Sequence, residues 1–381
     1  MSAAQWRRAM NSGAAGAVRP LPEVTPGTAR GPSSAPMDVQ ASATRWLDRL
    51  RLAVRPRHVI VMAFVLLLPL FATPFMLFQV VAQSLVLGLI ALSLTFLGGY
   101  GGMVSLAQMT VAGVAGYALA VLGHSSAREI SLGWPWWTAI PVALLISVGV
   151  ATLIGWLSVR TEGIYTIMIT LAIGVAFYYL VLQNYSVFNR LQGLREVYPP
   201  KVFGVAWRDP VPFYFLSLTC ALGGYFLIRW LVGAPFGKAL QGIRDNPRRM
   251  NALGYQVVAH RVAAYALAGL IAGVGGILFV WYNGLITPGS VGTSWLINIL
   301  VIAVLGGMKH PLGAFLGALV FVLLQTFAID LVDRERFNLV IGGVFLAIVL
   351  FSPDGLLGLW ERLRLRFAPR QSLSSNPRRQ K

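Results

Sequence analysis

The densest run of side chains capable of chemistry is FGKALQGIRDNPRRMNALGY, residues 236–255. It carries four cations, Lys238, Arg244, Arg248 and Arg249, beside the single acid Asp245. Guanidinium and ammonium groups form strong hydrogen bonds to carboxylates and phosphates. The run therefore predicts a contact surface, either for a partner protein or for anionic lipid at a membrane.

Catalytic and nucleotide-binding patterns are absent from the sequence. Gly237 and Lys238 supply a Gly-Lys pair without the glycine loop and the hydroxyl of a G-x-x-x-x-G-K-[ST] phosphate site. No acid, base and nucleophile cluster together, and the four histidines are scattered without metal-ligand spacing. We expect a protein that is not an enzyme, with no catalytic residue, no metal and no cofactor of its own. A transport step would take its energy from another subunit.

The elements around this run are strongly apolar. The chain is 56% hydrophobic and 12% charged, whereas soluble domains carry about 25% charged residues. Because about 20 apolar residues cross a bilayer as a helix, the sequence predicts an all-α polytopic membrane protein with about ten (eight to ten) transmembrane helices. No Asp, Glu, Lys or Arg lies in the middle of a span, which argues against a stand-alone ion-coupled carrier. The uncharged stretches begin near residues 59, 79, 101, 134, 163, 211, 262, 295, 311 and 338.

The net charge of +18 is concentrated in three segments that flank apolar spans, 1–58, 233–261 and 354–381. This is the positive-inside pattern of a membrane protein and does not indicate nucleic-acid binding. We therefore place both termini and the loop 233–261 in the cytoplasm. The expected organisation is a disordered basic extension (1–44), a transmembrane permease-like domain (45–361) and a basic cytoplasmic tail (362–381). Within the loop, Pro247 suits the first turn of a second short helix with Asn246 as its N-cap.

Glycines mark where helices should break or pack closely. GGYGGMVSLAQ, residues 98–108, has four glycines in five positions, and each costs a helix about 1 kcal/mol relative to Ala. Two interpretations remain open: a discontinuous helix beside a translocation path, with Ser105 and Gln108 as polar contacts, or close packing through Gly98 and Gly102 at GxxxG spacing. The pairs Gly269/Gly273 and Gly313/Gly317 indicate packing. Candidate path residues are Gln83, Ser105, Gln108 and Asn298, although each could equally be a helix–helix hydrogen bond.

The order of residues in the polar run resembles the cytoplasmic coupling loop of LivM-type permease subunits of branched-chain amino-acid ABC importers, in the LivH/LivM permease family. Further segments resemble this family in the same order: GGYGGMVSLAQ at 98, RTEGIYTIMITLA at 160, VLGGMKHPLGAFLGA at 304 and FSPDGLLGLW at 351. The resemblance covers residues 58–361. In the loop, the family pattern G-[RK]-A-L-x-A-I-R-[DE]-N is matched by Gly237, Lys238, Ala239, Leu240, Ile243, Arg244, Asp245 and Asn246, followed by Ala252, Leu253 and Gly254.

The resemblance implies a permease subunit in the bacterial inner membrane that translocates branched-chain amino acids, or related small amino acids or amides. The implied partners are a second LivH-like permease, a periplasmic solute-binding protein that delivers the substrate, and two cytoplasmic LivG/LivF-like ATPases that hold ATP-Mg. Arg244, Asp245 and Asn246 would contact an ATPase. Asn298 and Val175 stand where relatives often carry an acid. Urea, short amides or aromatic carboxylates therefore remain alternative substrates.

Overall fold

The computed structural model describes residues 68–69, 71–127, 129–161, 163–201, 204, 206–331, 342–343, 346 and 355–358. All of them belong to one unit of the chain, Leu66–Lys381. The expected extension 1–44, the tail 362–381, the first part of the first expected span and most of the last one lie outside the described residues.

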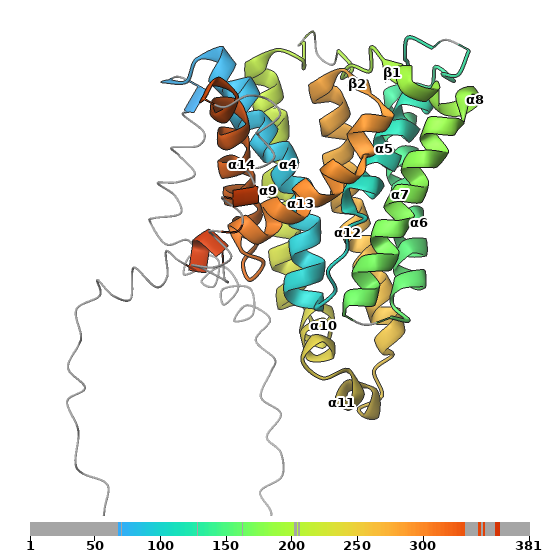
Figure 1. Ribbon diagram of the computed structural model, residues 1–381, viewed down its shortest axis with the longest axis vertical. Coiled ribbons are helices and arrows are strands. Elements are labelled where there is room, and N and C mark those ends of the chain that lie inside the picture. Colours follow the sequence, from blue (N-terminus) through green and yellow to red (C-terminus); the bar gives the residue numbers. More distant parts are fainter. Residues whose placement is uncertain are drawn as a thin grey trace, which may run out of the picture. The chain divides into compact units, whose positions relative to one another are not determined.

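Helices make up most of this unit, as the sequence predicts (Figure 1). Their lengths and apolar character follow from the uncharged stretches, in which every backbone hydrogen bond must be made within the helix if the segment lies in lipid. The elements are η1 (Met76–Ala82), α4 (Gln83–Thr95), η2 (Phe96–Tyr100), α5 (Gln108–Leu122), α6 (Trp136–Ser158), α7 (Ile164–Gln183), α8 (Tyr185–Phe188), η3 (Arg190–Gln192), β1 (Leu194–Arg195), α9 (Pro210–Gly233), α10 (Pro235–Asp245), α11 (Pro247–Ala252), α12 (Val257–Asn283), β2 (Leu285–Ile286), η4 (Pro288–Val291), α13 (Thr293–Gly306) and α14 (Pro311–Leu331).

Within the described residues, five helices are long and apolar enough to cross a membrane. They are Met76–Tyr100 (η1, α4 and η2 together), α6, α7, α9 and α12. The span expected near residue 295 needs correction, because α13 has 14 residues and is about 21 Å long, too short for a core of about 30 Å. α13 and the first part of α14 qualify only as a pair bent by 117°, as a broken span or a re-entrant loop.

α12 is the helix around which the others pack, since it contacts α4, α5 and α6. Glycines bring these backbones close together. A Cβ atom on Gly273 would lie 2.8 Å from the Ser147 hydroxyl oxygen on α6, and one on Gly269 would overlap Ala151 of the same helix. Gly313 and Gly317 of α14 face the backbone of α13 in the same way. Both glycine pairs therefore lie at helix–helix contacts.

Gly276 gives a test of this packing. A Cβ atom there would overlap the carbonyl oxygen of Ala112 on α5, a backbone atom that cannot rotate away. We expect Gly276→Ala to destabilise the protein by about 1–3 kcal/mol, the usual cost of overpacking. Gly149→Ala on α6 is the control, because a Cβ atom there meets open space. Thermal unfolding in detergent measures both variants, and equal melting temperatures would contradict the packing of α12 on α5.

A short β-ladder joins two loops, although the sequence predicts only helices. β1 pairs antiparallel with β2 through Leu194 and Ile286 and through Arg195 and Leu285. Figure 1 shows this ladder at the opposite end of the helices from α10 and α11. The ladder fixes the loop after α7 to the end of α12.

Candidate functional site

The charged run folds as two short helices, α10 and α11, between the long helices α9 and α12. On α10, Ala239, Leu240 and Ile243 are buried at helical spacing, whereas Lys238 and Asp245 are exposed. This is the pattern of an amphipathic surface helix, with one apolar face toward the protein. The charged side of α10 therefore forms part of the protein surface beside the ends of α9 and α12.

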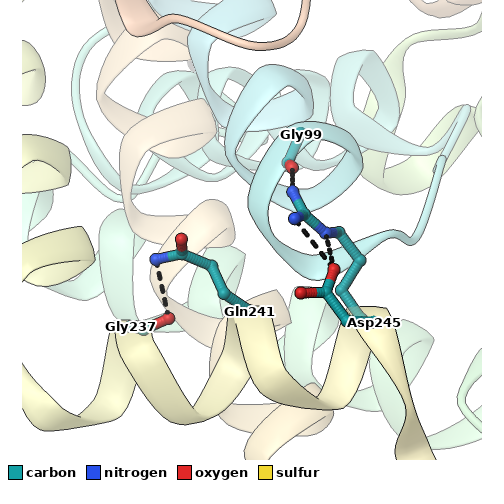
Figure 2. A network of polar contacts seen from close by, with 5 residues as sticks. Gly99, Gly237, Gln241 and Asp245 are labelled. Atoms are coloured by element: carbon teal, nitrogen blue, oxygen red, sulfur yellow. Dashed lines mark hydrogen bonds and ion pairs between the residues drawn. The ribbon is translucent and has the colours of Figure 1, made fainter. Parts of the chain in front are cut away.

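α10 is firmly attached to the end of α9. The backbone at Gly237 touches the Leu231 carbonyl oxygen, which leaves no room for a side chain. The Gln241 side-chain nitrogen donates to the carbonyls of Gly237 (3.1 Å) and Val232 (3.4 Å); Figure 2 shows the first of these bonds. The Gln241–Val232 bond and the close approach of Gly237 to Leu231 therefore join α10 to α9.

α11 begins as the sequence predicts. Asn246 is its N-cap, its side-chain oxygen accepts from the Arg249 backbone N–H at 2.9 Å, and Pro247 occupies the first turn. Asn246 and Ala252 are exposed. Gly254 follows the helix with φ +90°, a conformation that favours glycine.

Arg244 connects α10 to a helix far away in the sequence. Its Nε and Nη2 atoms lie 3.0 and 2.9 Å from Asp245 Oδ1, and its Nη1 atom donates to the Gly99 carbonyl at 2.6 Å. Figure 2 shows the Gly99 carbonyl facing α10 and the ion pair with Asp245. Gly99 lies in the last turn of the helix Met76–Tyr100, where carbonyls lack intrahelical partners and a cation is favoured. The guanidinium thus caps that helix.

The helical element capped by Arg244 ends at Tyr100, and residues 102–107 are not helical. Gly102 has φ +68°, so Gly98 and Gly102 are not one turn apart on a helix, and the GxxxG alternative is wrong. The Leu106 backbone N–H is satisfied by the Thr170 hydroxyl of α7 at 3.1 Å, and Ser105 is fully buried. Apart from the exposed Gly102, the interruption is buried or half-buried in the protein, an arrangement in which a membrane tolerates irregular backbone.

The bend between α13 and α14 contacts the same interruption. Gly99 lies directly against the Met308 carbonyl oxygen, and the Tyr100 hydroxyl donates to the Lys309 carbonyl at 3.4 Å. Gly307, where α13 ends, has φ +99°. We call this contact of three segments the junction; it comprises Gly98–Gly102, Arg244 and Met308–Lys309.

The candidate path residues fall in different places. Gln108 and Ser105 lie together at the start of α5, where Gln108 accepts a hydrogen bond from Ser93 at 3.0 Å. Gln83 is bonded to the Tyr282 hydroxyl (3.4 Å) and lies about 15 Å along the helix from Ser93. Asn298 is half-buried on α13. The structure therefore brings Ser105 and Gln108 together and leaves Gln83 apart from them.

The sequence analysis did not single out three buried hydroxyls that lie on or against α5 and the segment before it. Thr170 supports the interruption, Ser147 reaches carbonyls of α5 and α12 (3.2 and 3.4 Å), and the Thr110 hydroxyl is buried without a hydrogen-bond partner in the structure. Thr170 was within reach of prediction, because it belongs to the quoted segment RTEGIYTIMITLA. Within the described ranges, no three His, Cys, Asp or Glu side chains are grouped to hold a metal ion.

Comparison with known proteins decides the family. A profile of the family described as "Branched-chain amino acid transport system / permease component" matches residues 76–349. The chain belongs to this family. The permease is 24% identical to the LivM branched-chain amino acid permease of Salmonella typhimurium over 75% of this chain and 72% of that protein. The LivM permease of Escherichia coli K12 is 24% identical over 71% of this chain and 67% of that protein.

A shorter match widens the range of relatives. The nucleoside ABC transporter permease NupC of Lactococcus lactis is 28% identical over 30% of this chain and 35% of that protein. No solved structure gives a significant match. The permease is therefore a multi-pass inner-membrane protein of the ABC importers, which work with ATPases and solute-binding proteins.

Proposed function

We propose that this permease is the LivM-type subunit of an importer for branched-chain amino acids or related small amino acids or amides. Its partners would be a second LivH-like permease, a periplasmic solute-binding protein and two cytoplasmic LivG/LivF-like ATPases that hold ATP-Mg. The chain itself would bind no cofactor and catalyse no reaction. The names of the LivM relatives support the substrate class, and the binding protein would make the final selection among amino acids, urea, short amides and aromatic carboxylates.

The proposed orientation puts α10, α11 and both chain termini in the cytoplasm, with 1–44 and 362–381 as basic segments outside the transmembrane domain 45–361. The concentration of Lys and Arg in the segments next to spans supports it. The exposed face of α10 and α11 would then meet the ATPases through Lys238, Asp245 and Asn246, with Ala252 and Gly254 beside them.

One observation carries the proposed mechanism: Arg244 bonds to Asp245 beside it and to Gly99 in the junction at the same time. Closure of an ATPase on α10 would shift the guanidinium, and with it the last turn of the helix Met76–Tyr100. The Arg244 and Asp245 side chains are 39% and 66% exposed, and an exposed ion pair contributes little energy. The role of Arg244 is therefore geometric.

The path itself would pass the start of α5. Ser93, Ser105 and Gln108 lie there in the protein interior, and interrupted helices in transporters offer their polar ends to substrate. Ala107, the N-cap of α5, supplies no side-chain hydrogen bond. A substrate carboxylate near this helix start would gain from the positive end of the helix dipole.

Reconstitution tests this function. Proteoliposomes with all subunits, ATP on the ATPase side and loaded binding protein on the other side should accumulate labelled leucine. The matched control uses ATPases unable to hydrolyse ATP, and we expect no accumulation with them. Uptake by the permease alone, driven by an ion gradient, would instead identify a stand-alone carrier. Thermal-shift screening of the binding protein distinguishes amino acids from the other substrates.

A further inference from the structure

A groove lies between the end of α6, α11 and the first turns of α12, away from the junction. Its volume is about 970 Å³. Trp156 of α6 forms one wall, and α12 forms the other. In Figure 1, α11 lies below the first turns of α12.

Polar and apolar residues are segregated along this groove. Arg248 and Asn251 of α11 and Gln256, just before α12, line one end. Val258, Val262 and Ala266 line the wall on α12, and their spacing of four residues makes a stripe about 12 Å long. The groove is therefore polar where it meets the short helices and apolar along the spans.

One cation lines the polar end, and a second lies against the Trp156 wall. Arg248 is exposed and lines the groove, and the Arg160 guanidinium lies over the Trp156 ring, 4.7 Å from its centroid. No Asp or Glu is among the lining residues of the described chain; Glu162 lies outside the described residues. The groove thus has a cation in its lining, Arg248, and a second, Arg160, stacked on its Trp156 wall, so its charge suits an anionic group.

We propose that this groove binds an anionic phospholipid of the membrane. Its phosphate would lie between Arg248 and Arg160, and one acyl chain would follow Val258, Val262 and Ala266. Trp156 and Val258 are 48% and 53% exposed, and tryptophan favours the depth of the lipid headgroups. The apolar wall belongs to two helices that are long and apolar enough to cross a membrane, where acyl chains would lie alongside it and a soluble ATPase would not reach it.

Native mass spectrometry of the detergent-purified permease tests the proposal, with phosphatidylglycerol and phosphatidylcholine offered in equal amounts. The wild type should retain phosphatidylglycerol preferentially. Arg160→Gln/Arg248→Gln should bind it about twenty-five-fold more weakly, because each basic residue at the surface contributes roughly fivefold. Lys238→Gln/Arg249→Gln is the matched control, since it also removes two cations, one each from α10 and α11, that lie outside the groove lining, and it should retain wild-type binding.

The apolar wall is tested separately. Ala266→Phe fills the groove and Val258→Glu places a charge on its exposed wall, so both should lose the lipid although both arginines remain. Equal lipid loss in the two double variants, or full retention in the two wall variants, would overturn the proposal. A photo-crosslinker at position 258 that captures a protein subunit in place of lipid would overturn it as well.

Discussion

Replacing Arg244 with Ala is expected to lower ATP-driven uptake by tenfold or more while the permease still assembles in the membrane. The variant removes the hydrogen bond to the Gly99 carbonyl and both contacts with Asp245. A hydrogen bond from a charged group contributes about 1.5–3 kcal/mol, which corresponds to at least tenfold in an equilibrium that depends on it. ATPase activity should continue without its stimulation by loaded binding protein, because the link between α10 and the junction is gone.

Three further variants separate the parts of this link. Arg244→Lys keeps the charge but not the planar fork that reaches two partners at once, so it should restore little uptake. Asp245→Ala leaves the Gly99 bond in place and should reduce uptake less than Arg244→Ala. Arg249→Ala, which removes an exposed cation from α11, should transport normally. Unchanged uptake in Arg244→Ala/Asp245→Ala would falsify the coupling role, and ligand binding by the solute-binding protein should stay the same in every variant.

The elements that were predicted well from the sequence are those determined by residues close together in the chain. Five spans follow from runs of about 20 uncharged residues, since length and apolarity alone decide whether a helix can cross a bilayer. The two short helices follow from Pro247 and the N-cap Asn246, because capping involves neighbours three residues apart. The glycines of GGYGG predicted an interruption through their cost to a helix.

The junction could not be predicted, because its contacts join distant parts of the chain. Arg244 and Gly99 are 145 positions apart, and nothing in either segment specifies the other. Sequence identified Arg244 from its charge and Gly99 from the helix break, but it assigned the arginine only to an outside partner. Its bond inward depends on how α10 packs against the end of another helix.

The bend between α13 and α14 was hidden for a different reason. No charged residue occurs between Val262 and Met308, so hydropathy could not show that α13 ends after 14 residues. Gly307 and its positive φ mark the turn, yet Gly-Gly pairs also occur inside packed helices such as α12. Gln83 was hard to assign for a similar reason. A glutamine in an apolar span looks the same in the sequence whether it bonds another helix, as Gln83 bonds Tyr282, or lines a translocation path.

Gly99→Ala should be the most damaging single-methyl change in the junction. A Cβ atom on Gly99 would overlap the Met308 carbonyl oxygen, which belongs to the backbone of the α13–α14 bend. The clash can be relieved only if the two backbones separate, which would also move the carbonyl that Arg244 binds. We expect the variant to lose about 1–3 kcal/mol of stability and at least tenfold in uptake.

Its neighbours provide the controls. A Cβ atom on Gly98 would meet the Met308 sulfur at 3.0 Å, the mobile part of a flexible side chain. Gly98→Ala should therefore have the melting temperature and the uptake of the wild type. Gly102→Ala should be intermediate, because φ +68° costs a side chain about 1–2 kcal/mol and its Cβ atom would lie 2.6 Å from Arg244 Cγ. Thermal unfolding and uptake measure the series. Equal melting temperatures and equal uptake for Gly99→Ala and Gly98→Ala would contradict the contact between the α13–α14 bend and the helix end. A movement of Arg244 could then not be passed to α13 and α14 through Gly99 and Met308.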